Sequence, residues 1–147
     1  MTRSRSGVIV FVLLALAVGV ALSLDYTDTY VADRFRKALA AGQYRPGEPF
    51  SLDAFLDYHD WDRICFVAPG HAPDLRNRFG LAYSPAMRED GWSLVFIRGD
   101  AVVAEVALAD AELAPPRPLP EECLERWATF VSIEEDGPAR RLSVLGH

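Results

Sequence analysis

The longest hydrophobic run of the chain lies near its N-terminus. It reads GVIVFVLLALAVGVALSL and extends from Gly7 to Leu24 without a charged residue. Arg3 and Arg5 precede it, and Asp25 follows it directly. A run of this length just reaches what a helix needs to cross a bilayer, about 20 residues. The pattern therefore predicts a transmembrane helix over residues 7–24.

The charges around this run predict its orientation. Arginines before a transmembrane helix stay in the cytoplasm, so everything after Leu24 should face outward. We therefore expect a single-pass protein of the bacterial inner membrane, with its N-terminus cytoplasmic and its C-terminal domain periplasmic. A cleaved secretory signal is the alternative, because Ala21 and Ser23 are small residues at cleavage-site spacing. The domain would then be secreted to the periplasm after cleavage near Ser23.

A helical period follows the apolar run. Four apolar residues recur at helical spacing and form one stripe: Val31, Phe35, Ala38 and Leu39. They predict a helix over about residues 29–41, ended by Gly42. Residues 43–50, QYRPGEPF, form a turn-rich connector.

The remaining apolar segments have strand patterns. Residues 62–67, DRICFV, predict a first strand. Residues 92–108, WSLVFIRGDAVVAEVAL, predict a hairpin with its turn at Gly99 and Asp100, and its first arm is apolar on both faces, as in a central strand. Residues 127–134 and 139–145 predict a second hairpin joined by EDGP.

Two connecting segments complete the predicted fold. The proline-rich strap, residues 112–122, cannot lie inside a helix or a sheet, so it should wrap the outside. A short helix is predicted over residues 73–80. We therefore expect an α+β protein, in which a transmembrane helix precedes a small domain with a mostly antiparallel sheet of about five strands and helices on one face. Its parts would be residues 1–24 (anchor or uncleaved signal), 25–50 (helix and connector) and 51–147 (periplasmic α+β domain).

The charge of the exported part limits its partners. Residues 25–147 carry 13 basic and 21 acidic side chains, a formal charge of −8. An acidic surface repels nucleic-acid phosphates and attracts basic groups. We therefore expect no nucleic acid and a basic protein partner.

The chain has two cysteines, Cys65 and Cys123. Two cysteines in an oxidising compartment usually pair, so we predict a disulfide. Two buried free thiols are one alternative. A catalytic Cys65 thiol with His59 or His71 as its base is another, although an apolar strand raises the pKa of a thiol and makes it inert.

An acidic segment leads into the first predicted strand. Asp57, His59, Asp60 and Asp62 lie within DYHDWDRIC and could in principle bind a metal. Their spacing is neither that of a zinc site nor that of a calcium loop, so we expect no metal and no cofactor. We predict instead that Asp60 or Asp62 bonds backbone amides where the chain bends, with Trp61 packed beneath. These four residues are also our candidate partner surface.

The run from Phe50 to Gly70, FSLDAFLDYHDWDRICFVAPG, together with the hairpin around LVFIRGDAVV, resembles a set of small bacterial envelope proteins. In these proteins, many of them predicted lipoproteins, a W-D-[KR]-hydrophobic-[Cys or Tyr] phrase precedes a turn of the P-[YG] type. The resemblance covers about residues 50–145. It implies an envelope location and an α+β fold, and it transfers no catalytic residue. The chain departs from the set because it has no lipobox cysteine and because Gly70 stands where many members have tyrosine.

These observations predict a membrane-anchored, exported, non-catalytic domain that binds a protein partner in the envelope, as an immunity or inhibitor protein or an adaptor does. The alternative is an accessory subunit of an inner-membrane complex, held by residues 7–41. A small thiol- or histidine-dependent hydrolase is the third reading. The chain contains none of the common phosphate-binding or serine-hydrolase motifs, and we expect no catalytic residue.

Overall fold

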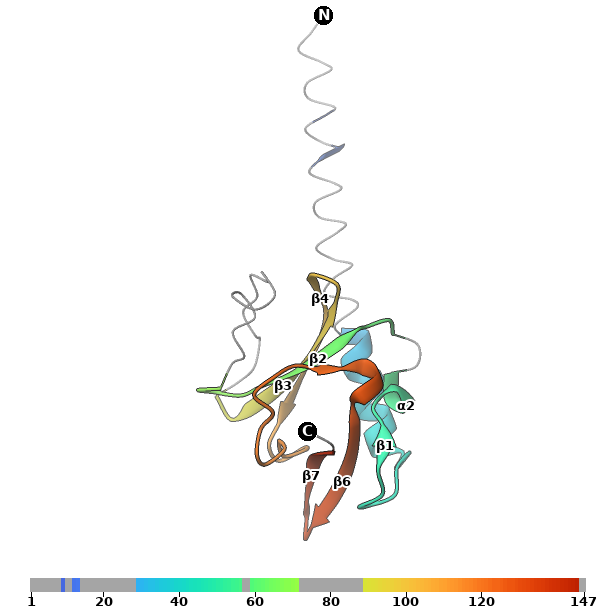
Figure 1. The fold of residues 1–147 in the computed structure, drawn as a ribbon, viewed down its shortest axis with the longest axis vertical. Helices are drawn as coiled ribbons and strands as arrows, with labels where there is room; N and C mark the ends of the chain where they lie inside the picture. The colour runs from blue at the N-terminus through green and yellow to red at the C-terminus, as the bar shows by residue number, and fades with distance from the viewer. Residues whose placement is uncertain (1–8, 10–11, 14–28, 57–58, 72–88, 146–147) are drawn as a thin grey trace, which may run out of the picture.

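The computed structural model of the chain describes residues 9, 12–13, 29–56, 59–71 and 89–145. These residues form two antiparallel sheets with short helical elements beside them (Figure 1). The strands are β1 (Phe50–Ser51), β2 (Arg63–Val67), β3 (Gly91–Arg98), β4 (Ala101–Ala109), β5 (Leu124–Glu125), β6 (Phe130–Asp136) and β7 (Ala139–Leu145). The helical elements are residues 29–40, α2 (Asp53–Leu56) and the 3₁₀ helix η1 (Arg126–Ala128).

The helix over residues 29–40 begins and ends close to its predicted bounds. Its end is a Schellman motif: Gln43 N–H bonds to the Ala38 carbonyl and Gly42 N–H to the Leu39 carbonyl, both at 3.3 Å. Gly42 has a φ of 62°, which a residue without Cβ adopts at little cost. On its outer side, Arg36 donates to the Ala107 carbonyl at the free edge of β4, at 2.6 Å.

The first hairpin forms as predicted. β3 and β4 pair in antiparallel register around Gly99 and Asp100, and Gly99 has a φ of 60°. β3 is also the central strand that its two apolar faces predict, because the four-stranded sheet has the order β4-β3-β2-β5. Seven of its eight residues are buried, which accounts for the absence of an apolar–polar alternation.

The predicted single sheet of about five strands, with helices on one face, is wrong. The described strands form two sheets of four and three strands, and the second has the order β1-β6-β7. The strap carries the chain from β4 to β5 at the opposite edge of the first sheet. The second hairpin then pairs with β1 instead of the first hairpin, through Phe50↔Val131 and Ser51↔Phe130.

No helix in the described part of the chain is long and apolar enough to cross a membrane. This finding contradicts the transmembrane helix predicted over Gly7–Leu24 and the single-pass inner-membrane location based on it. Crossing requires about 20 apolar residues in one helix. The longest described helix spans only residues 29–40 and carries charged side chains such as Arg36. Most of the predicted segment, like the short helix predicted over residues 73–80, lies outside the described residues.

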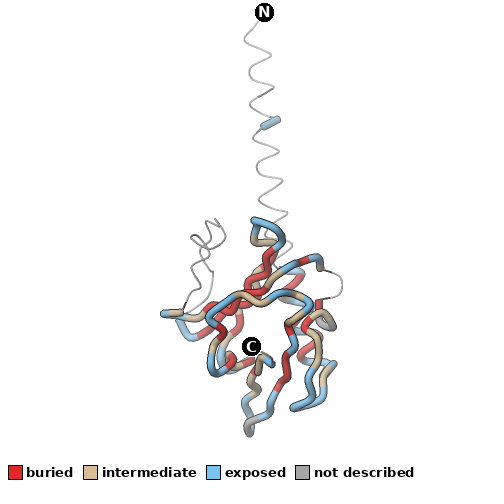
Figure 2. The backbone as a smooth tube through the Cα atoms, in the orientation of Figure 1, coloured by how far each residue is buried: buried red, intermediate tan, exposed pale blue. Residues whose placement is uncertain are grey.

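The main core lies between the two sheets and the helix. Buried residues of β2, β3 and β4 form one cluster with those of β6, β7 and the helix. Figure 2 shows where the buried residues lie along the backbone. Trp92 belongs to this core, and its Nε1 donates to the Leu113 carbonyl of the strap at 2.7 Å. A second, smaller cluster with Cys65, Val95 and Ile97 covers the other face of the four-stranded sheet. The strap is therefore joined to both faces of the first sheet, through Leu113 on one and Cys123, which follows it directly, on the other.

Candidate functional site

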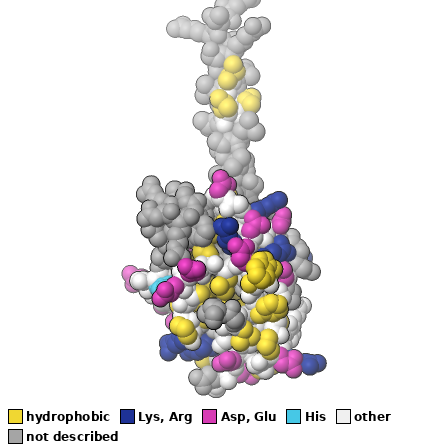
Figure 3. Space-filling model, in the orientation of Figure 1, with side chains coloured by type: hydrophobic (Ala, Val, Ile, Leu, Met, Phe, Trp, Pro, Cys, Tyr) yellow, Lys and Arg dark blue, Asp and Glu magenta, His cyan; other side chains and the backbone are white. Residues whose placement is uncertain are grey.

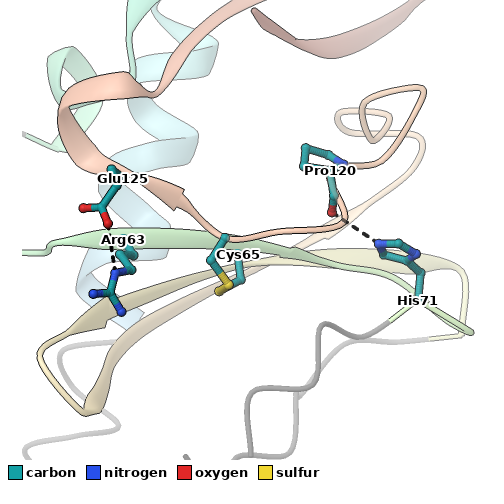
Figure 4. The surroundings of a disulfide bond; sticks show 6 residues. Arg63, Cys65, His71, Pro120 and Glu125 are labelled. Atoms are coloured by element: carbon teal, nitrogen blue, oxygen red, sulfur yellow. Dashed lines mark hydrogen bonds and ion pairs between the residues drawn. A yellow bond between two sulfur atoms is a disulfide. The ribbon is translucent and has the colours of Figure 1, made fainter. Parts of the chain in front are cut away.

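The predicted disulfide is present and joins β2 to the end of the strap. Cys65 and Cys123 are bonded with their Cα atoms 4.2 Å apart (Figure 4). Cys65 is fully buried on β2. In this bonded form Cys65 has no thiol, so the described structure does not offer the nucleophile that a thiol hydrolase needs.

Two polar contacts flank the disulfide along the same line. Arg63 pairs with Glu125 at 3.3 Å, and His71 Nε2 lies 3.2 Å from the Pro120 carbonyl oxygen (Figure 4). Residues 118–125 line an apolar groove and are here called the groove wall. They are thus attached to β2 and its following turn at three points. Attachment at three points limits how far this irregular segment can move before a ligand binds, which lowers the entropic cost of binding.

The acidic segment before β2 has a structural role, as we predicted, but the backbone amide that it binds belongs to the first hairpin turn and not to the bend itself. Asp62 Oδ2 accepts a hydrogen bond from Gly99 N–H at 2.7 Å, and Asp62 N–H donates to the Ile97 carbonyl at 2.7 Å. Asp60 pairs with Arg98 at 3.1 Å. Both aspartates therefore hold the turn of the first hairpin against the bend that leads into β2.

Trp61 packs beneath this bend, as predicted. It is 1 % exposed, and its ring meets Phe96 edge to face at a centroid distance of 5.3 Å. His59 also lies edge-on to Phe96, at 6.4 Å. Asp57, the remaining residue of the predicted partner surface, lies outside the described residues. Its participation, like that of the other three, remains a prediction.

Arg126 organises this region, and sequence reasoning did not find it. Its Nε donates to Asp53 at 2.7 Å, and its guanidinium lies 5.4 Å from the centre of the Trp61 ring. Its Nη1 is 3.4 Å from Asp60. The partners are 73, 65 and 66 positions away. The pairing of β5 with β2 and that of β6 with β1 together bring η1 beside α2 and the bend before β2 (Figure 1), so no local pattern could have revealed the cluster.

An acidic cleft of about 540 Å³ opens beside Arg126. Its charged lining consists of four carboxylates and two arginines: Asp53, Asp60, Asp62, Glu125, Arg63 and Arg126. Both arginines already pair with carboxylates of the lining. Arg98 pairs with Asp60 from outside the lining, so the four carboxylates face three arginines and the cleft keeps an excess of one negative charge, which favours a cation from outside. Among the described residues, no group of three or more histidine, cysteine, aspartate or glutamate side chains is placed to hold a metal ion.

Trp127 borders the acidic cleft and is 79 % exposed. Phe130 and Leu145, which face each other across β6 and β7, are 47 % and 37 % exposed. These three exposed residues lie on η1 and on the paired ends of β6 and β7, of which β6 follows η1 closely, and we call them the Trp127 patch. Figure 3 shows hydrophobic side chains gathered near the middle of one face, with charged side chains toward its border. The sequence placed Trp127 at the start of a strand and gave no indication of its exposure.

An apolar groove of about 590 Å³ adjoins the cleft. It is lined by the groove wall and by Ala128 of η1. Glu125 lines both the cleft and the groove, so the two hollows share a border. No family model, no curated protein and no solved structure matches this chain. The resemblance to small envelope proteins therefore remains a prediction.

Proposed function

We propose that this chain is a non-catalytic protein-binding domain that uses the Trp127 patch to contact a basic partner. The observation that carries the proposal is the exposure of Trp127. Trp61 and Trp92, the other two tryptophans, are 1 % and 0 % exposed, whereas Trp127 has 79 % of its surface in water. Tryptophan is enriched among the residues that contribute most to protein interfaces, because burying its large ring is favourable.

The surroundings of Trp127 support a basic partner. The acidic cleft lies directly beside the indole, and its carboxylates outnumber its arginines. A lysine or arginine of the partner could lie over the Trp127 ring in a cation–π contact while facing Asp60 or Asp62. Such a surface suits a domain that blocks the basic cleft of another protein, as an inhibitor does, or that links two proteins as an adaptor.

The proposal is tested by site-specific crosslinking at Trp127 in the cells that make the protein. A photoreactive phenylalanine analogue at position 127 should give a discrete adduct with one protein or a few. The same analogue at Tyr30, which is 39 % exposed on the helix of residues 29–40, is the matched control. We expect no adduct there, because that position lies on a different element.

Capture by the purified domain provides the second measurement. Trp127→Ala should remove the crosslinked protein from the captured fraction without changing the unfolding midpoint, since an exposed side chain contributes little to stability. A protein captured equally by the Trp127→Ala variant would contradict the proposal. Adducts of equal yield at positions 127 and 30 would contradict it as well.

A further inference from the structure

We infer that the groove beside the Trp127 patch binds an extended segment of the partner in which basic and apolar residues alternate. This inference rests on the proposed function and specifies the chemistry of the partner. The groove is built by one continuous stretch of chain, residues 118–125, and by Ala128. Such a hollow suits a strand-like peptide that lies along the stretch.

The floor of the groove accepts apolar side chains. Pro118, Leu119, Pro120, Leu124 and Ala128 contribute to its lining, and most of the lining surface is apolar. Its volume of about 590 Å³ is in the range of pockets that hold several side chains of a ligand. A leucine, valine or proline of the partner would lose water contact here.

The rim of the groove is acidic. Glu121, Glu122 and Glu125 line the groove and are exposed, and among the described residues that line it none is lysine, arginine or histidine. Glu125 pairs with Arg63. Complementary charge on the ligand therefore means lysine or arginine beside the apolar side chains.

The backbone of the groove wall favours an extended ligand. Within the described chain, no backbone–backbone hydrogen bond involves residues 116–123. β5, at the end of the wall, is the edge strand of the four-stranded sheet. Peptides often bind such edges by adding a strand, which gives affinity through the main chain and selectivity through alternate side chains. A ligand of alternating character would place its apolar residues in the groove and its basic residues at the rim.

The wall is also held in place before any ligand arrives. The disulfide of Cys123, the His71 contact to Pro120 and the ion pair of Glu125 attach it to β2 and its following turn. A fixed wall loses little conformational freedom on binding, which favours a measurable affinity even for a short peptide.

The experiment measures binding of a fluorescein-labelled peptide of alternating lysine and leucine to the full chain by fluorescence anisotropy. The comparison peptide alternates glutamate and leucine and has the same length. We expect saturable binding of the lysine peptide and at least about tenfold weaker binding of the glutamate peptide. Equal binding of both would overturn the inference, because apolar contact alone would then suffice.

Charge reversal at the rim tests the location. Glu121→Lys together with Glu122→Lys should weaken binding of the lysine peptide about tenfold. The matched control reverses two exposed carboxylates elsewhere, Glu89→Lys with Asp100→Lys, and changes the net charge equally. Equal weakening by both pairs would show attraction to overall charge and would overturn the inference. If the rim variant fails to fold, Ala128→Tyr, which fills the groove, should abolish binding instead.

Two further outcomes distinguish other occupants and the wider proposal. A concentration-dependent dimer of the chain alone, broken by Ala128→Tyr, would assign the groove to a second copy and overturn the inference. If the lysine peptide does not bind while Trp127→Ala still removes the crosslinked partner, the inference fails and the proposed function stands. If the lysine peptide binds at the rim and position 127 gives no crosslinked adduct, the Trp127 patch is excluded as the contact surface. The groove is then the binding site without it.

Discussion

At the scale of single residues, position in the fold gives the same side chain opposite roles. Trp61 packs under the bend before β2, whereas Trp127 lies open beside the acidic cleft. Asp62 and Asp100 are a second example of two identical side chains with different roles. Both are exposed and lie near the first hairpin turn, yet among the described residues Asp62 is the one whose carboxylate accepts a hydrogen bond there, from Gly99 N–H at 2.7 Å. Geometry therefore gives Asp62 a structural role at the turn that its sequence neighbours do not reveal.

Asp62→Ala should lower the free energy of unfolding by about 1 kcal/mol, because Gly99 N–H loses its carboxylate acceptor. The exposure of Asp62 keeps the effect from being larger, since water can replace part of the contact. Urea denaturation measures the change. Asp100→Ala is the control, and we expect it to stay within about 0.5 kcal/mol of the wild type. Equal effects of both substitutions would remove the structural role assigned to Asp62.

At the scale of elements, the strap and the disulfide decide how the two sheets are joined. The chain leaves β4, passes Leu113, whose carbonyl accepts from Trp92, and reaches Cys123 next to β5. The bond between Cys65 and Cys123 fixes the end of a long irregular connection to the centre of the first sheet. It also positions η1, which carries both Arg126 and Trp127.

Removal of the disulfide should destabilise the domain strongly. The bond closes a loop of 58 positions, for which loss of chain entropy in the unfolded state corresponds to about 4 kcal/mol. The double variant Cys65→Ala, Cys123→Ala should therefore unfold at a clearly lower urea concentration. Reductant should lower the wild-type midpoint and leave that of the variant unchanged. A wild-type midpoint insensitive to reductant at equilibrium would contradict this account.

The local features of the fold were predictable and the non-local ones were not. Gly42 after an apolar stripe, and Gly99 with Asp100 between two strand patterns, are signals carried by adjacent residues, and both elements form. β1 and β5 have only two residues each, which is too few to show an alternation of apolar and polar residues. The division into two sheets could therefore not be predicted from the sequence. The predicted anchor over Gly7–Leu24 is contradicted as well, since no helix in the described part of the chain is long and apolar enough to cross a membrane.

The candidate site shows the same division. The cysteine pair and the roles of Asp62 and Trp61 could be predicted, because two cysteines allow only one pairing and polar residues at a bend have few alternatives. Arg126 could not, since its carboxylate partners lie on α2 and before β2. The groove could not either, because it depends on how the strap returns to β2.

At the scale of the whole molecule, negative charge dominates. The full chain has a formal net charge of −6. Several of the arginines form close ion pairs with carboxylates that are distant in sequence, such as Arg63 with Glu125 and Arg126 with Asp53. Excess charge of one sign keeps proteins apart and attracts partners of opposite sign, but it also strains the compact state through self-repulsion.

The stability of the domain should therefore rise when sodium chloride increases from low to physiological concentration. Screening extends over about 8 Å at physiological ionic strength and weakens repulsion between carboxylates more than it weakens the close ion pairs. The unfolding midpoint in urea at several salt concentrations measures this. The Glu89→Lys, Asp100→Lys variant should show a smaller rise, because its net charge is closer to zero. A fall in stability with salt would mean that the ion pairs outweigh the repulsion.

The contact of Arg36 with the Ala107 carbonyl affects what happens when many copies of the chain are crowded together. β4 is a nine-residue edge strand rich in alanine and valine, a composition from which ordered fibrils readily grow. The guanidinium occupies one of the carbonyl groups to which an incoming copy would bond, and the helix that carries it stands beside the strand. One side chain thus removes one of the acceptors on which growth along this edge would depend.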